Sequence, residues 1–259
     1  MSFYKKENIL IVAHRGASYA APENTIPAFE IAFQEKADFI EGDFWLTKDN
    51  EIVCIHDSNT SRVGKKSIDV RSSNLTTLKN VDLGIWKGEQ FAGTTIPTLQ
   101  EVLKIIPEQK GIHLEIKDNR EKILNRLKEI LKESNIPNEK IRLISFHRNI
   151  IRAAKKYLPE LKAYLIFGWY FSKGNYFKSL AQKLIMRKLN TVNCDGVVMF
   201  ADSYIDEKFV QTLKNMNLDV CIYNVEDANK AIKLSNYNVD SLTTNSPLKI
   251  RKVIETITI

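Results

Sequence analysis

Short runs rich in Val and Ile alternate along this chain with longer amphipathic stretches, and that order restricts the folds open to it. Eight runs have the length and composition of buried strands. They are Ile9–Ala13, Asp38–Phe44, Ile112–Lys117, Ile141–Ser145, Lys162–Phe167, Gly196–Phe200, Asp219–Tyr223 and Val239–Thr243. Helices are expected at Pro27–Gln34, Leu99–Ile106, Arg120–Leu131, Asn149–Tyr157, Lys178–Leu189, Glu207–Met216, Asp227–Ser235 and Leu248–Thr256. Eight strands with eight helices in about 250 residues predict a TIM (β/α)8 barrel.

A ninth strand-like run, Glu51–Ile55, does not fit the alternation. Only the polar turn Lys48–Asn50 separates it from the second strand, so it is expected to return antiparallel as a hairpin. Residues 58–96 predict an insertion above the carboxyl-terminal face of the strands, either an irregular loop or a small helical cap. Residues 1–259 are thus expected to form one barrel domain. The alternative is an open doubly wound sheet with a small second unit.

Composition excludes several protein classes. With 44% hydrophobic, 27% charged and 9% aromatic residues, the chain is expected to bury a core and not to be disordered. No early apolar run approaches the ~20 residues of a membrane span, and no signal peptide is expected. Cys54, Cys194 and Cys221 are too far apart to indicate a disulfide framework or a zinc cage, which favours a reducing cytoplasm.

The formal net charge is +7, which would attract phosphate, anionic lipid or nucleic acid. Basic residues occur along the whole chain, and we interpret most of them as solvated surface. No recognisable nucleic-acid-binding module is present, so nucleic acid is not an expected partner.

Polar residues follow the predicted strands at the ends where barrel enzymes assemble their active sites. They form four groups: His14-Arg15-Gly16, Glu41-Gly42-Asp43, His56-Asp57 and Glu115-Ile116-Lys117. Because side chains alternate along a strand, Glu41 and Asp43 share one face, and Glu115 and Lys117 share another. The sequence therefore predicts one polar site at this rim.

Three carboxylates, Glu41, Asp43 and Glu115, are expected to converge there and to repel one another unless a cation neutralises them. Oxygen ligands alone favour Mg²⁺ or Ca²⁺ over zinc. The alternative is a structural ion network, in which Arg15 and Lys117 pair with the carboxylates and no metal is bound.

Two histidines and two cations complete the predicted site. His14 and His56 each close a strand-like segment and are candidates for general acid and base, because imidazole exchanges protons near neutral pH. Arg15 and Lys117 supply the fixed positive charge that a phosphate group requires.

The remaining histidines indicate structural roles. His113 is expected deeper in the barrel as a hydrogen-bonded core residue, and His147 in a loop or helix cap. Before the first helix, Asn24 or Thr25 is expected to act as N-cap, while Glu23 or Asn24 would also reach the site.

Taken together, these motifs resemble the glycerophosphodiester phosphodiesterase family. The matching segments are His14–Gly16, Pro22–Thr25, Glu41–Asp43, His56–Asp57, Val81–Gly84, Ile96–Leu99, Glu115–Lys117 and Ser145–Phe146. Each tripeptide is weak evidence by itself, whereas the ordered set over about 130 residues is specific.

The resemblance implies a TIM barrel that hydrolyses glycerophosphodiesters, such as glycerophosphocholine or glycerophosphoethanolamine, to glycerol 3-phosphate and an alcohol. It implies a divalent metal, Mg²⁺ or Ca²⁺, on the positions of Glu41, Asp43 and Glu115. It also implies general base and acid roles for His14 and His56, and phosphate binding by Arg15 and Lys117. Glu23, Asn24 and Tyr223 are further expected substrate contacts.

Three segments depart from the family pattern. Thr60–Gly64 keeps only Arg62 of a Leu-x-Arg-Thr-Thr run, Tyr223–Glu226 replaces Trp-Thr-Val-Asn, and Thr244–Pro247 replaces Thr-Asp-x-Pro. None of them removes a predicted metal ligand or histidine. Because of these departures, the sequence does not assign the alcohol that is released from the substrate.

Two other functions remain open at this point. A lipid-directed phosphodiesterase acting on lysophospholipids or phosphatidylinositol would use Trp169–Phe171 and the basic stretch Lys178–Lys188 on an anionic membrane. We favour instead an outer barrel helix whose Leu180, Leu184 and Ile185 pack on the strands. The second alternative is a barrel that binds a phosphorylated ligand without catalysis. The sequence does not assign which metal is bound or which histidine is the acid and which the base. It also does not decide between a cyclic intermediate and direct attack by water, and it does not give the oligomeric state.

Overall fold

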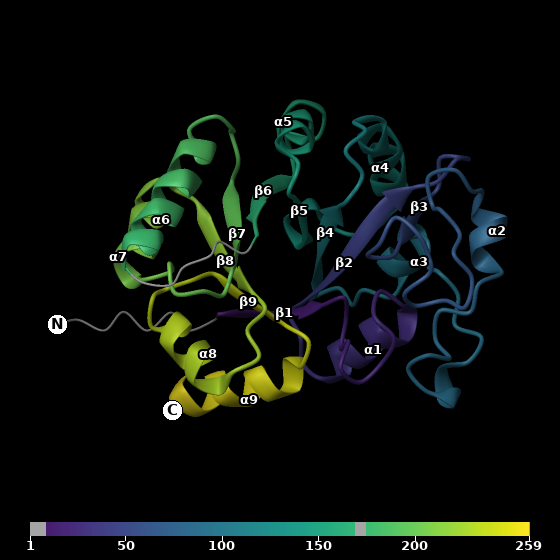
Figure 1. Cartoon of the computed structure of the whole chain (residues 1–259), viewed down its shortest axis with the longest axis horizontal. Coiled ribbons are helices and arrows are strands. Elements are labelled where there is room, and N and C mark those ends of the chain that lie inside the picture. Colours follow the sequence, from purple (N-terminus) through teal and green to yellow (C-terminus); the bar gives the residue numbers. More distant parts are fainter. Residues whose placement is uncertain (1–8, 169–174, 259) are drawn as a thin grey trace.

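The computed structural model describes residues 9–168 and 175–258 (Figure 1). Its sheet contains strands β1 Leu10–His14, β2 Phe39–Leu46, β3 Ile52–Cys54, β4 Gly111–Ile116, β5 Ile141–Ser145, β6 Lys162–Phe167, β7 Gly196–Phe200, β8 Asp219–Tyr223 and β9 Ser241–Thr244. All of these except β3 pair in parallel in the order β1-β9-β8-β7-β6-β5-β4-β2, and β1 pairs with β2. The sheet thus closes on itself, and the predicted TIM barrel is confirmed.

Helices surround this barrel, as Figure 1 shows. They are α1 Ile26–Gln34, α3 Leu99–Lys104, α4 Lys122–Glu133, α5 Arg148–Tyr157, α6 Asn175–Leu189, α7 Glu207–Asn215, α8 Ala228–Ser235 and α9 Pro247–Thr258. Each lies where the amphipathic pattern predicted a helix, with ends that differ by a few residues. The largest shift is at α6, which begins three residues earlier than predicted, and several other ends, such as the start of β9, differ by two residues.

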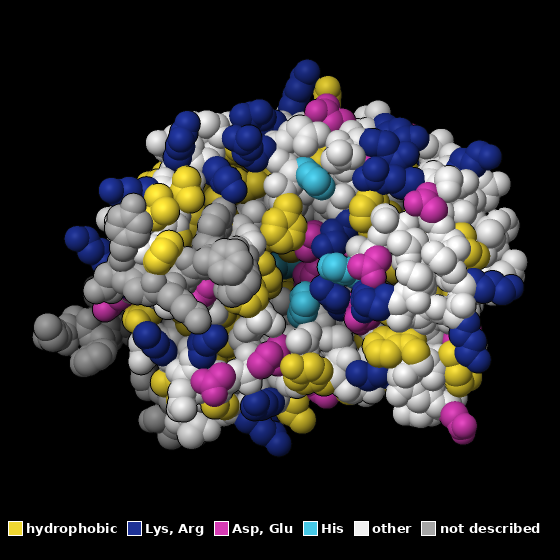
Figure 2. Space-filling model, viewed as in Figure 1, with side chains coloured by type: hydrophobic (Ala, Val, Ile, Leu, Met, Phe, Trp, Pro, Cys, Tyr) yellow, Lys and Arg dark blue, Asp and Glu magenta, His cyan; other side chains and the backbone are white. Residues whose placement is uncertain are grey.

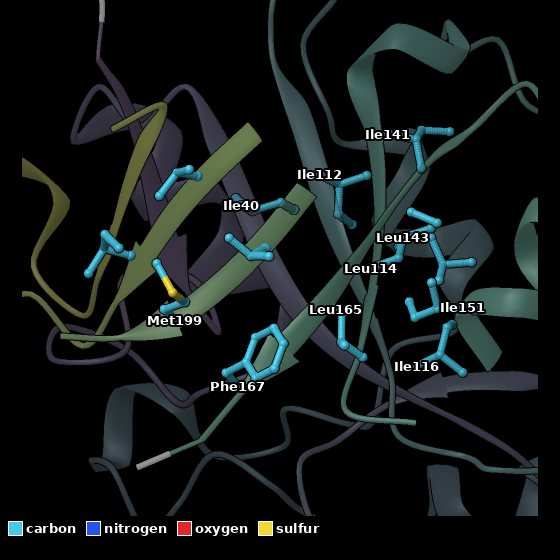
Figure 3. Packing of buried hydrophobic residues seen from close by; sticks show 14 of the residues in the cluster. Ile40, Ile112, Leu114, Ile116, Ile141, Leu143, Ile151, Leu165, Phe167 and Met199 are labelled. Atoms are coloured by element: carbon cyan, nitrogen blue, oxygen red, sulfur yellow. The ribbon is translucent and has the colours of Figure 1, made fainter. Parts of the chain in front are cut away.

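The alternation of side chains along each strand separates two environments. On β4, Ile112, Leu114 and Ile116 point outward and pack against the helices (Figure 3), while His113 and Glu115 point into the barrel. Burial of the outward row against the helices stabilises the fold by about 25 cal/mol per Å² of apolar surface. The inward row is left for the site.

Strand register brings the carboxylates together. In the parallel pair of β2 and β4, Glu41 lies opposite His113 and Asp43 lies opposite Glu115. Across the neighbouring pair of β1 and β2, His14 lies opposite Glu41. Three strands therefore bring their predicted polar side chains to neighbouring positions at the same end of the barrel.

The predicted hairpin is confirmed, because β3 pairs antiparallel with β2 and opposes Cys54 to Phe44. The following insertion contains α2 Leu75–Lys79 and the 3₁₀ helix η1 Glu89–Phe91. It has its own buried apolar cluster, formed by Val53, Ile55, Val63, Val70, Leu78, Val81, Leu83 and Ile96. A packed cluster of this kind favours the small cap over a plain irregular loop. That residues 1–259 form a single domain stays a prediction.

The prediction for α6 was wrong in one respect. Ala181, Ile185 and Leu189 form its buried face, at a spacing of four residues, whereas Leu180 is 42% exposed and Leu184 is 38% exposed. Leu180 and Leu184 lie about 100° around the helix from that face, so they cannot pack on the strands with Ile185. The predicted membrane segment Trp169–Phe171 lies outside the described residues. Within 9–168 and 175–258, no helix has the length and hydropathy to cross a bilayer.

Candidate active site

A cavity of about 290 Å³ opens at the carboxyl ends of the strands. Its polar side is formed by His14, Arg15, Glu41, His56, Glu115 and Lys117, and its apolar side by Ile144, Phe146, Ile166, Val198, Phe200 and Tyr223. Figure 2 shows histidine side chains at this hollow, with basic and acidic side chains around them. Nearly all predicted site residues thus meet at one place, with Tyr223 on the apolar wall.

Three carboxylates form the most buried part of the site. Glu41, Asp43 and Glu115 each offer an oxygen within 4.8 Å of the others, and their exposed fractions are 3%, 1% and 8%. Burial and the charges of Asp43 and Glu115 raise the pKa of Glu41 well above its usual value. Burial and Asp43 raise the pKa of Glu115 to about 7. The cluster therefore carries unfavourable negative charge that a cation would relieve.

Asp43 is the carboxylate that the protein itself stabilises in the ionised form. Burial alone would raise its pKa, but the charges of Lys117 and Arg15 outweigh burial, and the pKa lies below its usual value. Lys117 Nζ lies 3.2 Å from Asp43 Oδ1, and Arg15 Nε lies 3.3 Å from Oδ2. Lys117 Nζ also donates to Glu115 Oε1 at 2.7 Å.

These ion pairs leave one carboxylate oxygen of Glu41 without a hydrogen-bond partner among the described residues. Its Oε2 accepts a hydrogen bond from the backbone N–H of Arg15 at 2.9 Å, while its buried Oε1 has no partner among the described atoms. A purely structural ion network would leave that oxygen desolvated and unpaired, which is costly. Three clustered carboxylates with one open oxygen fit a hard divalent cation such as Mg²⁺ or Ca²⁺.

Asn24 reaches the site as predicted, but it does not cap the first helix. The N-cap of α1 is Thr25, and neither side chain caps the helix amides. Asn24 is 2% exposed, donates from Nδ2 to Asp43 Oδ2 at 2.8 Å and accepts from the Asp43 backbone N–H at 3.0 Å. It also accepts from Cys54 Sγ at 3.2 Å. Asn24 thus holds Asp43 in place, and its direct contact with substrate stays a prediction.

Glu23 links two arginines, and its predicted contact with substrate stays a prediction. Arg15 Nη1 donates to its Oε1 at 3.0 Å, and Arg62 from the insertion donates to both of its oxygens at 2.8 and 2.7 Å. Arg62 Nε donates in turn to Asp57 Oδ2 at 2.6 Å, and Asp57 Oδ1 lies 2.7 Å from His56 Nδ1. A continuous chain of hydrogen bonds therefore connects His56 to Arg15.

The two candidate catalytic histidines have different partners. His56 Nδ1 faces the carboxylate of Asp57, whereas His14 Nδ1 lies 2.8 Å from the amide oxygen of Asn245. Burial and Arg15 lower the pKa of His14 to about 4. Burial, with Lys117 and Arg15, also lowers the pKa of His56, although Asp43 and Asp57 oppose the shift. Both rings are thus neutral at pH 7, and their Nδ1 partners are acceptors that favour Nδ1–H tautomers.

The other two histidines have the structural positions that were predicted, with different contacts. His113 is 2% exposed and packs edge-on against Phe39 and Tyr164, and burial lowers its pKa to about 3. Its Nδ1 has no partner among the described atoms, so the expected hydrogen bond is missing there. His147 is the N-cap residue of α5, but its ring lies 3.2 Å from the Lys117 carbonyl and does not cap the helix.

Comparison with known proteins decides the family. The model of the glycerophosphoryl diester phosphodiesterase family matches residues 14–249. The chain belongs to that family. As a family member it is a phosphodiesterase, and the two halves of the cavity are the candidate substrate site of this phosphodiesterase.

Curated relatives and solved structures agree with this assignment. A glycerophosphodiester phosphodiesterase of Caldanaerobacter subterraneus subsp. tengcongensis is 39% identical over 166 residues, covering 61% of this chain and 66% of that protein. YhdW of Bacillus subtilis is 32% identical over 231 residues, covering 84% of this chain and 95% of its own. An Oleispira antarctica phosphodiesterase, solved with the product sn-glycerol-3-phosphate, superposes with a TM-score of 0.82 at 27% identity, covering 95% and 96% of the two chains.

Sequence reasoning did not assign roles to three residues of this phosphodiesterase site. Asp57 adjoins a predicted histidine, Arg62 is the one residue of its family run that is kept, and Asn245 stands at a departure from the family pattern. Each had a signal in the sequence. Their contacts with His56, Glu23 and His14 depend on loops whose paths only the tertiary structure shows.

Proposed function

We propose that this phosphodiesterase hydrolyses glycerophosphodiesters, such as glycerophosphocholine or glycerophosphoethanolamine, to glycerol 3-phosphate and an alcohol. One observation carries the proposal: a buried three-carboxylate cluster with an open oxygen on Glu41 lies in the same cavity as two neutral histidines and two cations. The product bound to the Oleispira antarctica relative supports glycerol 3-phosphate as the phosphorylated product.

Glu41, Asp43 and Glu115 would hold the divalent metal, Mg²⁺ or Ca²⁺. When bound, such an ion supplies Lewis-acid polarisation and neutralises part of the charge on the phosphodiester. Asn24 keeps Asp43 oriented for this role through its two hydrogen bonds.

Arg15 and Lys117 would bind the phosphate. Both line the cavity, and both already sit beside carboxylates that hold them in place. Burial alone would lower the pKa of Lys117, but Asp43 and Glu115 outweigh it and the pKa lies above its usual value, so the ammonium stays charged. Fixed cations at this position stabilise the additional negative charge of the transition state.

The histidine partners suggest an order for proton transfer. His14, held through Nδ1 by a neutral amide, keeps an unprotonated Nε2 and would remove the proton from the attacking oxygen. His56, whose Nδ1 faces the Asp57 carboxylate, would first take up a second proton from solvent on Nε2, because Asp57 stabilises the imidazolium, and would then donate it to the leaving alkoxide. Each transfer contributes about 10²- to 10⁴-fold in rate.

The apolar side of the cavity would receive the carbon skeleton of the substrate. Phe200 and Tyr223 meet edge to face at 5.4 Å, and Phe146 lies 5.8 Å from the Lys117 ammonium. Apart from the hydroxyl of Tyr223, the side chains of this wall are hydrocarbon and carry no group that could exchange a proton with the substrate. The wall therefore bears on which alcohol is accepted and not on the proton transfers.

The decisive experiment measures release of glycerol 3-phosphate from glycerophosphocholine and glycerophosphoethanolamine, and release of acylglycerol 3-phosphate from lysophospholipids. Each substrate is assayed with Mg²⁺, with Ca²⁺ and with EDTA. We expect metal-dependent release from the glycerophosphodiesters, and loss of nearly all turnover in His14→Ala and His56→Ala. Tyr157→Ala, which removes an exposed ring at the end of α5, is the control and should keep its activity.

Each alternative function gives a distinct result. Turnover of lysophospholipids alone would establish the lipid-directed enzyme instead. Tight binding of glycerol 3-phosphate without turnover of any substrate would establish the non-catalytic barrel. Full activity in both histidine variants would contradict the assignment of acid and base.

A further inference from the structure

Positive charge is concentrated in one part of this chain, contrary to the even spread read from the sequence. Residues 140–193 contain twelve Lys and Arg and a single acid, Glu160, which gives this segment a net charge of +11. The whole chain carries only +7, so the rest of the protein is net acidic. Segregation on this scale creates a strong local potential.

The excess lies on two neighbouring helices, α5 and α6, which contain no Asp or Glu. Arg148, Arg152 and Lys156 are spaced by four residues along α5 and are exposed, as are Lys183 and Arg187 on α6. None of these five forms an ion pair with a carboxylate in the part of the chain that the structure describes. We call these five residues, together with Lys188, the basic face.

Contacts just after the end of α6 connect the basic residues of α5 to those of α6. Arg148 donates to Thr191 Oγ1 at 3.3 Å, and Arg152 donates to the Thr191 carbonyl at 2.7 Å. Thr191 follows α6 by two residues. Three other lysines of the segment, Lys155, Lys162 and Lys178, pair with the carboxylates of Asp195, Asp219 and Asp206. The basic face therefore extends from α5 to the end of α6, where Thr191 connects the two helices.

Apolar side chains accompany these charges on α6. Phe177, Leu180 and Leu184 are 48%, 42% and 38% exposed, and their stripe lies about 100° around the helix from its buried face. With 100° per residue, Lys183 and Arg187 flank this stripe on one side and Lys188 on the other. Figure 2 shows hydrophobic and basic side chains together over α6.

We propose that the basic face and the exposed stripe of α6 dock on the surface of an anionic phospholipid bilayer. Lysines and arginines attract the charged headgroups, and an apolar stripe enters the headgroup boundary beside them. Nucleic acid fits the charges equally well, but it offers no apolar layer for two exposed leucines. This inference is independent of the reaction proposed above.

Docking in this way would place the cavity near the lipid surface. Phe146, 44% exposed, lines the cavity and lies two residues before the first residue of α5, Arg148. The rim of the cavity and the basic face are thus continuous along the chain. Glycerophosphodiesters released by deacylation of phospholipids at that surface would reach the site directly.

The test is sedimentation of the full chain with vesicles of phosphatidylcholine alone or mixed with phosphatidylglycerol. We expect binding to the mixed vesicles only, weakened by salt. The triple variant Lys183→Gln, Arg187→Gln, Lys188→Gln should bind about a hundredfold more weakly, since each basic residue at such a surface contributes about fivefold. The matched control, Lys122→Gln, Lys128→Gln, Lys132→Gln on α4, removes equal charge and should bind like the unchanged protein.

A second variant, Leu180→Ser with Leu184→Ser, tests the apolar contribution and should also lose binding. Met216→Ser, at another exposed apolar position, is its control. Circular dichroism should confirm that each variant is folded. Absence of binding to the mixed vesicles, equal losses in the α6 and α4 triples, or unchanged binding by the leucine variant would each overturn the proposal. Binding to an RNA or DNA oligonucleotide that is tighter than to the vesicles would overturn it in favour of nucleic acid.

Discussion

The guanidinium of Arg62 donates to both carboxylate oxygens of Glu23, at 2.8 and 2.7 Å. A bidentate pair of this kind fixes both side chains, because two parallel hydrogen bonds define one geometry. Arg62 belongs to the insertion, and Glu23 belongs to the loop after the first barrel strand. The pair therefore ties the insertion to the rim of the active site, between His56 and Arg15.

Arg62→Gln should lower kcat/KM for a glycerophosphodiester by about tenfold to a hundredfold, the range seen when a group that orients a site residue is lost. Without the arginine, Asp57 and Glu23 lose their shared cation and no longer fix His56 and Arg15. Steady-state kinetics measure the effect, and Arg62→Lys should recover part of it. Lys65→Gln removes an exposed cation from the same insertion and should leave kcat/KM unchanged. Equal losses in both would contradict a positioning role for Arg62.

Glu41→Gln should abolish metal binding while keeping the shape of the side chain. At a metal concentration a hundred times Kd, the unchanged protein should gain about 2.7 kcal/mol in free energy of unfolding, seen as a rise in Tm. The variant should show no such rise, because its amide carries no charge to hold the ion. Glu51→Gln, at a surface carboxylate paired with Arg126, is the control. A metal-induced rise in Tm that survives in Glu41→Gln would count against Glu41 as a ligand.

Asn24→Gly should weaken metal affinity by about tenfold to a hundredfold, because Asp43 loses the partner that orients it. It should also cost about 1–3 kcal/mol of stability, since the Asp43 N–H is left buried without an acceptor. Glycine avoids backbone strain, because Asn24 has a φ of 58°. Titration calorimetry and thermal melts measure the two effects.

The control for Asn24→Gly is Asn238→Gly, at an exposed position with a φ of 61°. It should change neither quantity by much. If Asn24→Gly lost stability but bound metal as before, Asn24 would serve the fold alone.

Asn245→Asp should raise the pKa of His14 from its value of about 4, because a carboxylate in place of the amide stabilises the protonated ring. A general base is active only when unprotonated, so raising its pKa moves the acidic limb of kcat/KM to higher pH. The variant should therefore lose activity on acidification before the unchanged protein does. Asn224→Asp adds the same charge elsewhere on the cavity wall and should move that limb less. An acidic limb that stays in place would show that His14 is not the base.

The sequence alone determined the fold and the chemical identity of the site. Alternation of strand and helix patterns predicted the parallel barrel, since each pattern matches the period of the element that buries it. The lack of room for a crossover at Lys48–Asn50 predicted the antiparallel hairpin, which β3 confirms. The position of Glu41, Asp43 and Glu115 at strand ends predicted the carboxylate cluster, because parallel strands end at one rim.

Only the tertiary structure showed which residues hold the site residues in place and which face of α6 is exposed. Asn24 reads as a helix cap because capping is local, but its amide bonds to Asp43 nineteen residues away. Leu180 reads as a core residue because apolar side chains on a helix do not reveal which of two faces the barrel covers. Long-range hydrogen bonds and the choice of a buried face depend on the packing of distant segments, and no periodicity in the chain records that packing.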